Sequence, residues 1–182
     1  MNFENLEKNN ENQKRIAMIE RLKTGFEQKA GLVLVLLGEK PALSLAIFVD
    51  TPEEAQIEEE KINNIGLKSR KTSQQEKNGK YIIKFLIARN DNNLNELAEA
   101  DPSVDHAKFG GLMGYPSTAV EAFSEGKLMD IDEERELLGK YPEIVFHNFR
   151  LSQDGQEEEI ETLKRWNSII KKAAPNIYPR IG

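Results

Sequence analysis

The chain has 182 residues, of which 38% are hydrophobic and 31% are charged, so its composition is that of a folded domain rather than a disordered segment. A formal net charge of −6 argues against broad, nonspecific binding to nucleic acids or anionic membranes. The absence of cysteine excludes disulfides, thiolate nucleophiles and cysteine-ligated zinc or iron–sulfur centres.

We expect residues 1–182 to form a single domain, with residues 1–12 frayed because they are rich in Asn and Glu. Apolar residues recur at helical spacing over residues 13–30, which predicts a helix. The continuous apolar run Leu32–Leu37 has the length of a strand, and we expect it to be a central strand covered on both faces. The next apolar run, Ala42–Val49, is predicted to be its antiparallel neighbour.

A capped helix is predicted to follow these strands. Thr51 is a good N-cap residue, Pro52 suits the first helical position, and Glu54 completes a capping box. We expect this helix to end at Ile65, with Gly66 in the left-handed conformation that commonly closes a helix.

The dipeptide Asn78-Gly79 is the strongest hairpin signal in the chain and predicts a pair of antiparallel strands on either side of it. Counting outward from this turn, we expect Lys71 to lie opposite Leu86. The expected register places several lysines of the hairpin segment 68–84 on one face: Lys71, Lys77, Lys80 and Lys84.

This lysine face can attract RNA or an acidic protein surface. It lacks the aromatic residues that stack on bases, because Tyr81 and Phe85 are expected to point into the core. Lysines along the edge of a sheet also prevent pairing with other sheets, and we favour this interpretation. Binding to nucleic acid therefore stays open as a less favoured alternative.

Helical patterns dominate after residue 90. Asp101-Pro102 and Asp130-Ile131 each resemble the start of a helix, and residues 154–174 form a long amphipathic pattern with acidic residues first and lysines last. Between them, Glu143–Leu151 alternates in the manner of a strand. The predicted fold is α+β, with an amino-terminal antiparallel or mixed sheet of about four strands with helices, and a helical carboxy-terminal half with one further strand.

The most distinctive segment is rich in glycine. Gly110, Gly111 and Gly114 precede Tyr115-Pro116 and a short apolar helix that Ser117 or Thr118 can cap. Such a turn leaves backbone N–H groups at a helix start, where an anion, another ligand or a partner chain can bind. The spacing and the ending differ from those of a P-loop, so the simpler interpretation is a corner between helices.

The residues Leu112-Met-Gly-Tyr-Pro-Ser-Thr-Ala-Val-Glu-Ala-Phe123, followed later by His147-Asn-Phe-Arg-Leu-Ser152, resemble an uncharacterised prokaryotic family. Its members have a Leu-Gly-Tyr-Pro-x-Cys-Cys turn and a later His-x-Pro-Cys segment. The similarity covers roughly the carboxy-terminal 70–80 residues. Thr118 and Ala119 occupy the positions of the paired cysteines, so the resemblance implies that any metal or redox chemistry of those cysteines is absent or altered here. It implies an architecture and a candidate region, but no activity.

The chain has only two histidines, His106 and His147, and together with Asp105 they are candidate metal ligands or catalytic groups close to Thr118. A structural interpretation competes with this one. Asp105 can stabilise the first turn of a helix, and His147 alternates with apolar residues, as a hydrogen-bonded core histidine does. We favour the structural interpretation for both residues.

We predict a cytoplasmic protein, because the chain shows neither a signal-peptide pattern nor a membrane-spanning apolar run. Its predicted role is to bind a protein partner or a small ligand, without a cofactor, in the groove beside Gly110–Phe123. The candidate ligand-binding residues are Gly110, Gly111, Gly114, Tyr115, Ser117, Thr118 and His147. The alternatives are an enzyme or metal protein that uses His147, His106 and Asp105, and a nucleic-acid-binding accessory protein that uses the lysine face. A role without catalysis is favoured.

Overall fold

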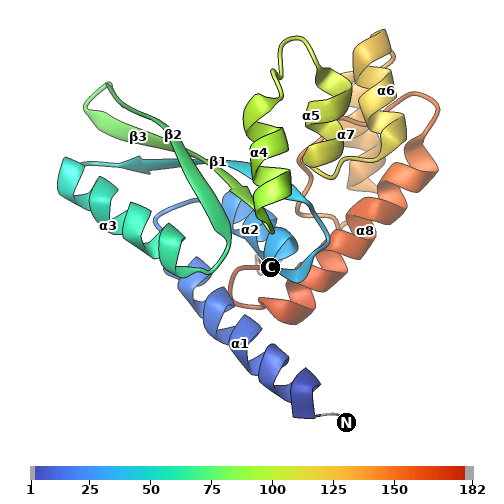
Figure 1. Ribbon diagram of the computed structural model, residues 1–182. Helices are drawn as coiled ribbons and strands as arrows, with labels where there is room; N and C mark the ends of the chain where they lie inside the picture. Colours follow the sequence, from blue (N-terminus) through green and yellow to red (C-terminus); the bar gives the residue numbers. More distant parts are fainter. Residues whose placement is uncertain (1–2, 179–182) are drawn as a thin grey trace.

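The computed structural model describes residues 3–178, which form an α+β fold of eight helices and one three-stranded sheet (Figure 1). Within this range, none of the helices combines the length and the apolar character that crossing a membrane requires. In chain order the elements are α1 (Phe3–Glu20), α2 (Phe26–Leu37), β1 (Ala42–Val49), α3 (Pro52–Asn64), β2 (Lys68–Lys77), β3 (Lys80–Ala88), α4 (Asp91–Glu99), α5 (His106–Leu112), α6 (Ser117–Glu125), α7 (Ile131–Gly139) and α8 (Gln156–Ala173).

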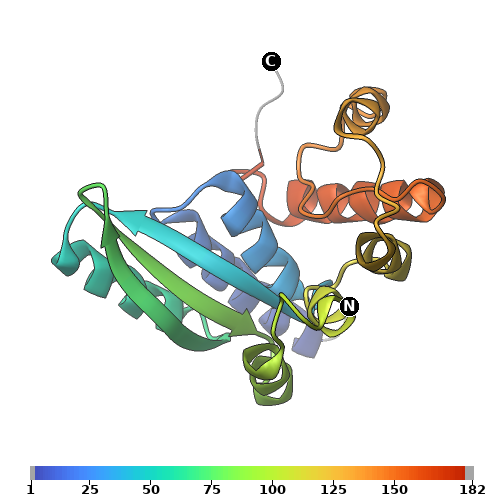
Figure 2. The same cartoon turned by 90° about the horizontal axis from the view of Figure 1, so that it is seen from above.

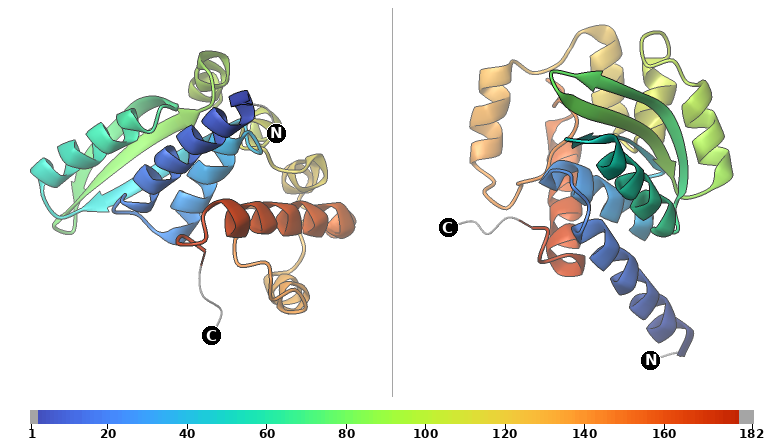
Figure 3. Two further views of the ribbon diagram at one scale, coloured as in Figure 1. Left: turned by 90° about the horizontal axis from the view of Figure 1, so that it is seen from below. Right: turned by 90° about the vertical axis from the view of Figure 1, so that its left-hand side faces the viewer.

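The sheet has the order β1-β3-β2, and both neighbouring pairs are antiparallel. β1 therefore pairs with β3 and not with the apolar run that precedes it. Helices α1, α2 and α3 lie against one face of the sheet (Figure 3). The prediction of about four strands in this sheet was wrong, because Leu32–Leu37 is not a strand. The further strand predicted at Glu143–Leu151 is also not found within residues 3–178.

The apolar run Leu32–Leu37 is the second half of helix α2. A short run that is buried on every side has the same pattern in a strand and in a helix, so periodicity does not distinguish the two. α2 lies between the sheet and α8 (Figure 2), where Val33 and Val35 pack into the core beside the sheet and Leu34 packs into the core around α8. Gly38 ends α2 in the left-handed conformation, with a φ of 85°.

The helix predicted over residues 13–30 is two helices. α1 begins at Phe3 and ends at Glu20, so residues 3–12 belong to this helix. Residues 21–25 form a non-helical connection to α2, which packs beside α1 (Figure 3). The remainder of the segment predicted to be frayed, residues 1 and 2, lies outside the described part of the chain.

The local turn and cap signals correspond to observed features. The Thr51 side chain accepts a hydrogen bond from the backbone N–H of Glu54 at 3.2 Å, and α3 is followed by Gly66 with a φ of 81°. Asn78 and Gly79 both have positive φ and join β2 to β3, as the two-residue hairpin turn requires.

The hairpin register differs from the prediction in one place. A bulge between Lys71 and Ser73 places Lys71 opposite Phe85 rather than Leu86. One extra residue in a strand moves the residues beyond it to the other face of the sheet. Lys71 consequently lies on the side of α3 and forms an ion pair with Glu59 at 2.5 Å. Lys77, Lys80 and Lys84 remain together on the opposite face of the hairpin.

The segment 143–151 is irregular and has no partner strand within residues 3–178. Its backbone is held by Asn167, a buried residue of α8. The Asn167 Oδ1 accepts hydrogen bonds from the N–H groups of Val145 at 3.0 Å and Phe146 at 2.9 Å, and its Nδ2 donates to the Phe146 carbonyl at 2.8 Å. A side-chain amide thus takes the place of a neighbouring strand.

Candidate ligand pocket

Two glycines let helices α5 and α6 meet at a tight corner. A Cβ on Gly110 would lie 2.7 Å from Val120 Cγ2, so a side chain there would push the two helices apart. Gly114 has a φ of 72°, and a Cβ on it would lie 3.0 Å from Pro41 Cδ. A Cβ on Gly111, by contrast, would project into open space.

The pocket lies between α5, α6 and the segment 148–150. Helices α5 and α6 lie side by side (Figure 1). Its volume is about 340 Å³. Its apolar lining includes Phe109, Tyr115, Ala119, Val120, Phe123 and Phe149. This size and composition are typical of a site for a small molecule.

The mouth of the pocket carries an aromatic pair. The rings of His106 and Phe123 meet edge to face, with their centroids 4.9 Å apart. Phe123 is 51% exposed, which is high for a side chain of this size. Both residues line the pocket, and Phe123 adds an exposed apolar surface to it.

Two polar side chains also line the pocket, Asn148 and Arg150. Arg150 is held in place by an ion pair with the buried Glu134 and by donation from its Nη2 to the Met129 carbonyl at 2.8 Å. Asn148 differs, because its Oδ1 is buried and has no hydrogen-bond partner among residues 3–178. An unpaired buried acceptor is unfavourable, so Asn148 is the least well satisfied polar residue of the lining.

The candidate residues of the glycine-rich segment fall into separate places. Gly110 and Tyr115 line the pocket. Ser117 is exposed at the start of α6, where Pro116 is the N-cap residue and no side chain caps the helix. The Thr118 hydroxyl donates to Glu159 of α8 at 2.8 Å, on the side of α6 that faces α8.

His147 is exposed and does not line the pocket; its neighbours Asn148, Phe149 and Arg150 line it instead. The expectation of a core histidine was wrong, because the segment does not run as a regular strand. The residue before the histidine, Phe146, is buried instead, and only 1% of it is exposed. The lining residues that the sequence analysis missed, Asn148, Phe149 and Arg150, come immediately after this histidine.

The candidate metal ligands are not gathered into a cluster. Within residues 3–178, no three or more His, Asp or Glu side chains are placed to share a metal ion. Asp105 is the N-cap of α5, and its carboxylate accepts the N–H of Lys108 at 3.0 Å. Asp101 was expected to start a helix but does not. Its carboxylate instead accepts hydrogen bonds from the hydroxyl and the backbone N–H of Ser103, which hold the pKa of this carboxyl below the usual value.

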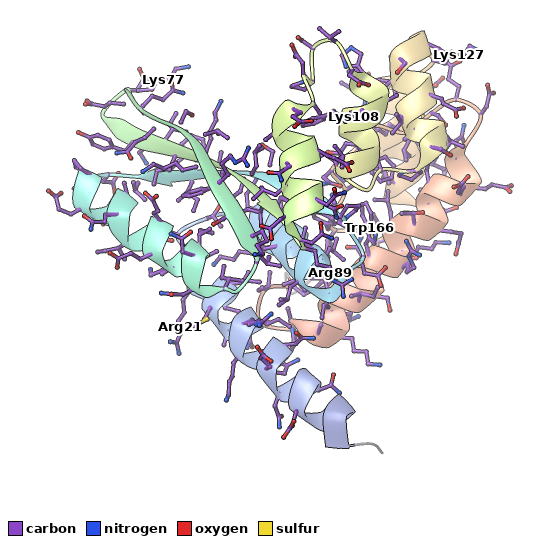
Figure 4. All side chains as sticks on the ribbon, viewed as in Figure 1. Arg21, Lys77, Arg89, Lys108, Lys127 and Trp166 are labelled. Atoms are coloured by element: carbon purple, nitrogen blue, oxygen red, sulfur yellow. The ribbon has the colours of Figure 1, made fainter. Side chains whose placement is uncertain are left out.

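The lysines of the hairpin are partly neutralised by acids. Lys71 pairs with Glu59 at 2.5 Å, and Lys80 lies 3.8 Å from Asp50. Lys77 lies at the tip of the hairpin, far from Lys108 and Lys127 at the opposite end of the molecule (Figure 4). The predicted lysine face is therefore reduced to Lys77, Lys80 and Lys84, of which Lys80 lies beside an acid.

The most unusual side chain near the pocket is Lys40, which the sequence did not single out. It lies in the turn between α2 and β1, is 1% exposed, and its Nζ has no hydrogen-bond partner in the described part of the chain. The Nζ lies 5.0 Å from the centre of the Tyr115 ring and 4.8 Å from that of the Trp166 ring. Trp166 projects from the side of α8 that faces α2 (Figure 4). Burial lowers the pKa of Lys40 to about 7.

No protein-family model, curated protein or solved structure matches the chain. The similarity to the Leu-Gly-Tyr-Pro-x-Cys-Cys family therefore stays a prediction.

Proposed function

We propose that the protein binds a small, largely apolar molecule in the pocket between α5 and α6. The observation that carries this proposal is the open cavity of about 340 Å³, whose lining is largely apolar and includes the polar residues Asn148 and Arg150. Apolar lining provides most of the binding free energy in such sites, and a few fixed polar groups provide orientation.

The expected ligand follows from the size and chemistry of the pocket. A volume of about 340 Å³ lies at the small end of the range for ligand sites, which suits one or two fused rings or a short aliphatic chain. Asn148 lines the pocket, and its side-chain amide is a group that can pair with one polar group of a ligand. The guanidinium of Arg150 is already engaged by Glu134, so the site favours a neutral ligand over an acid.

Titration of the isotope-labelled full-length protein with indole, followed by NMR, tests this proposal. Indole is neutral and apolar and carries a single N–H donor. We expect saturable shifts of the amides near Gly110, Phe123 and Asn148. Val120→Phe, which fills the pocket, should weaken indole binding at least about tenfold.

Ile57→Phe is the matched control, because Ile57 is 51% exposed on α3 and lies away from the pocket. This variant should bind indole as the unchanged protein does. Shifts that do not saturate, or equal affinity in the Val120→Phe variant, would contradict the proposed site.

The alternatives have less structural support. A metal or catalytic role for His147, His106 and Asp105 lacks a cluster in the described residues. A nucleic-acid role has less support because Lys71 lies on the other face of the hairpin, paired with Glu59, and Lys80 lies 3.8 Å from Asp50.

A further inference from the structure

Lys40 is held rigidly at the back of the pocket region. Its own backbone N–H and that of Glu39 both donate to the Leu34 carbonyl at the end of α2, at 3.3 Å and 2.9 Å. Gly114 closes against this turn, since a Cβ on it would lie 3.3 Å from Lys40 Cα. The glycine corner and the lysine turn are thus packed directly on each other.

Tyr115 is shared between Lys40 and the pocket. Its ring lies against the Lys40 amine, and the same residue lines the pocket and contacts Phe149, with ring centroids 5.6 Å apart. The side chain of Tyr115 therefore forms a wall with the apolar pocket on one side and a buried amine on the other.

We propose that Lys40 is a covalent capture site for a small apolar aldehyde or ketone, which reaches the amine from the pocket when the Tyr115 side chain rotates. This inference rests on the proposed ligand pocket and names the ligand class: a neutral carbonyl compound with an apolar body.

The chemistry is a reversible condensation. The lone pair of the neutral Lys40 Nζ attacks the carbonyl carbon to form a carbinolamine. Loss of one water molecule, which carries away the carbonyl oxygen and two hydrogens, leaves a C=N bond between ligand and lysine. No oxidant or reductant is consumed. A lysine with a pKa of about 7 is largely in the reactive neutral form just above neutral pH, whereas an ordinary lysine is almost wholly protonated.

A neutral carbonyl fits this environment better than a carboxylate. The Lys40 amine is flanked by Tyr115 and Trp166. Transfer of a carboxylate into such surroundings requires the loss of its hydration, with one buried cation as compensation. A carbonyl group has a much smaller desolvation penalty.

Reductive trapping tests the proposal. The full-length protein is incubated with benzaldehyde and sodium cyanoborohydride at pH 7.5, and the modified lysines are located by peptide mass spectrometry. We expect benzylation of Lys40 to be about tenfold or more faster than that of an average exposed lysine. Its rate should level off above about pH 7, while labelling of exposed lysines should keep rising with pH.

Two substitutions of Tyr115 test whether the aldehyde reaches Lys40 from the pocket. Tyr115→Leu removes the ring and should speed labelling of Lys40, whereas Tyr115→Phe keeps the ring and should leave the rate unchanged. Lys40→Met should remove the fast-reacting site and leave the slow labelling of exposed lysines unaltered. Thermal melting of each variant shows whether it is folded.

Labelling of Lys40 no faster than that of exposed lysines, in a protein that still binds indole, would overturn the capture site and leave the proposed pocket intact. Failure of both experiments would reject both proposals. An equal rate in the Tyr115→Leu and Tyr115→Phe variants would contradict entry through the pocket.

Discussion

Among single residues, Lys40 has the clearest energetic consequence. Burial lowers its pKa from 10.5 to about 7, so between these pH values the unfolded chain holds a proton that the folded protein lacks. The free energy of unfolding therefore rises as the pH increases across this window. The full shift corresponds to about 5 kcal/mol, and attraction of the ammonium ion to the two aromatic rings reduces this figure.

Lys40→Met should remove this pH dependence. Methionine has a similar length without a charge, and no hydrogen bond is lost because the Lys40 Nζ has none. From pH 7 to pH 9, we expect the free energy of unfolding of the unchanged protein to rise by about 2 kcal/mol relative to that of the variant. Urea unfolding at both pH values measures this difference.

Lys172→Met, at an exposed position of α8, is the control and should keep the pH dependence of the unchanged protein. Parallel pH curves for the Lys40→Met variant and the unchanged protein would mean that Lys40 remains an ammonium ion when folded.

At the scale of helices and strands, two glycines near the corner between α5 and α6 differ in what their positions require. Gly114 needs both a left-handed backbone and a close approach to Pro41. Gly111 lies within α5 and has neither requirement. The sequence does not distinguish the two glycines. The tertiary structure does, because only Gly114 packs on the turn before β1.

Gly114→Ala should destabilise the protein by about 2 kcal/mol, because alanine is strained at positive φ and its Cβ would press on Pro41. Gly111→Ala is the matched variant and should be neutral or stabilising by up to about 1 kcal/mol, since alanine favours a helix more than glycine does. Thermal or urea unfolding of the pair measures the contrast. Equal effects would contradict the assigned corner.

The elements that were predicted wrongly are those whose structure depends on contacts with residues distant in the chain. Glu143–Leu151 alternates like a strand, yet its backbone groups are paired by the Asn167 amide from α8. The bulge that turns Lys71 toward α3 depends on the packing of the hairpin rather than on its turn. Asn78-Gly79, by contrast, carries its conformation in its own backbone preferences, so the hairpin itself was predictable.

For the molecule as a whole, α2 is the element that both cores share. Val35 packs with the sheet, Leu34 packs with α8, and α2 lies between these two parts (Figure 2). A helix buried on both sides couples the stability of the two cores. We therefore expect the chain to unfold in a single cooperative transition.

Val35→Ala tests this coupling. The substitution lies in the core beside the sheet, whereas the single tryptophan, Trp166, lies in the core around α8. We expect a loss of about 2 kcal/mol and an equal shift of the urea midpoints measured by tryptophan fluorescence and by far-UV circular dichroism. An unshifted fluorescence transition would show that the two cores unfold independently.

The sequence alone determined the cap of α3 at Thr51 and the hairpin turn at Asn78-Gly79, which depend on a few neighbouring residues, and the α+β class. The tertiary structure decided whether the run Leu32–Leu37 is a helix, which residues line the pocket, and that Lys40 is buried. The physical reason is that caps and turns are stabilised by contacts within a few residues. The environment of a side chain such as Lys40 is instead set by Tyr115 and Trp166, which are distant in the chain and meet it only when α5, α6 and α8 have packed together.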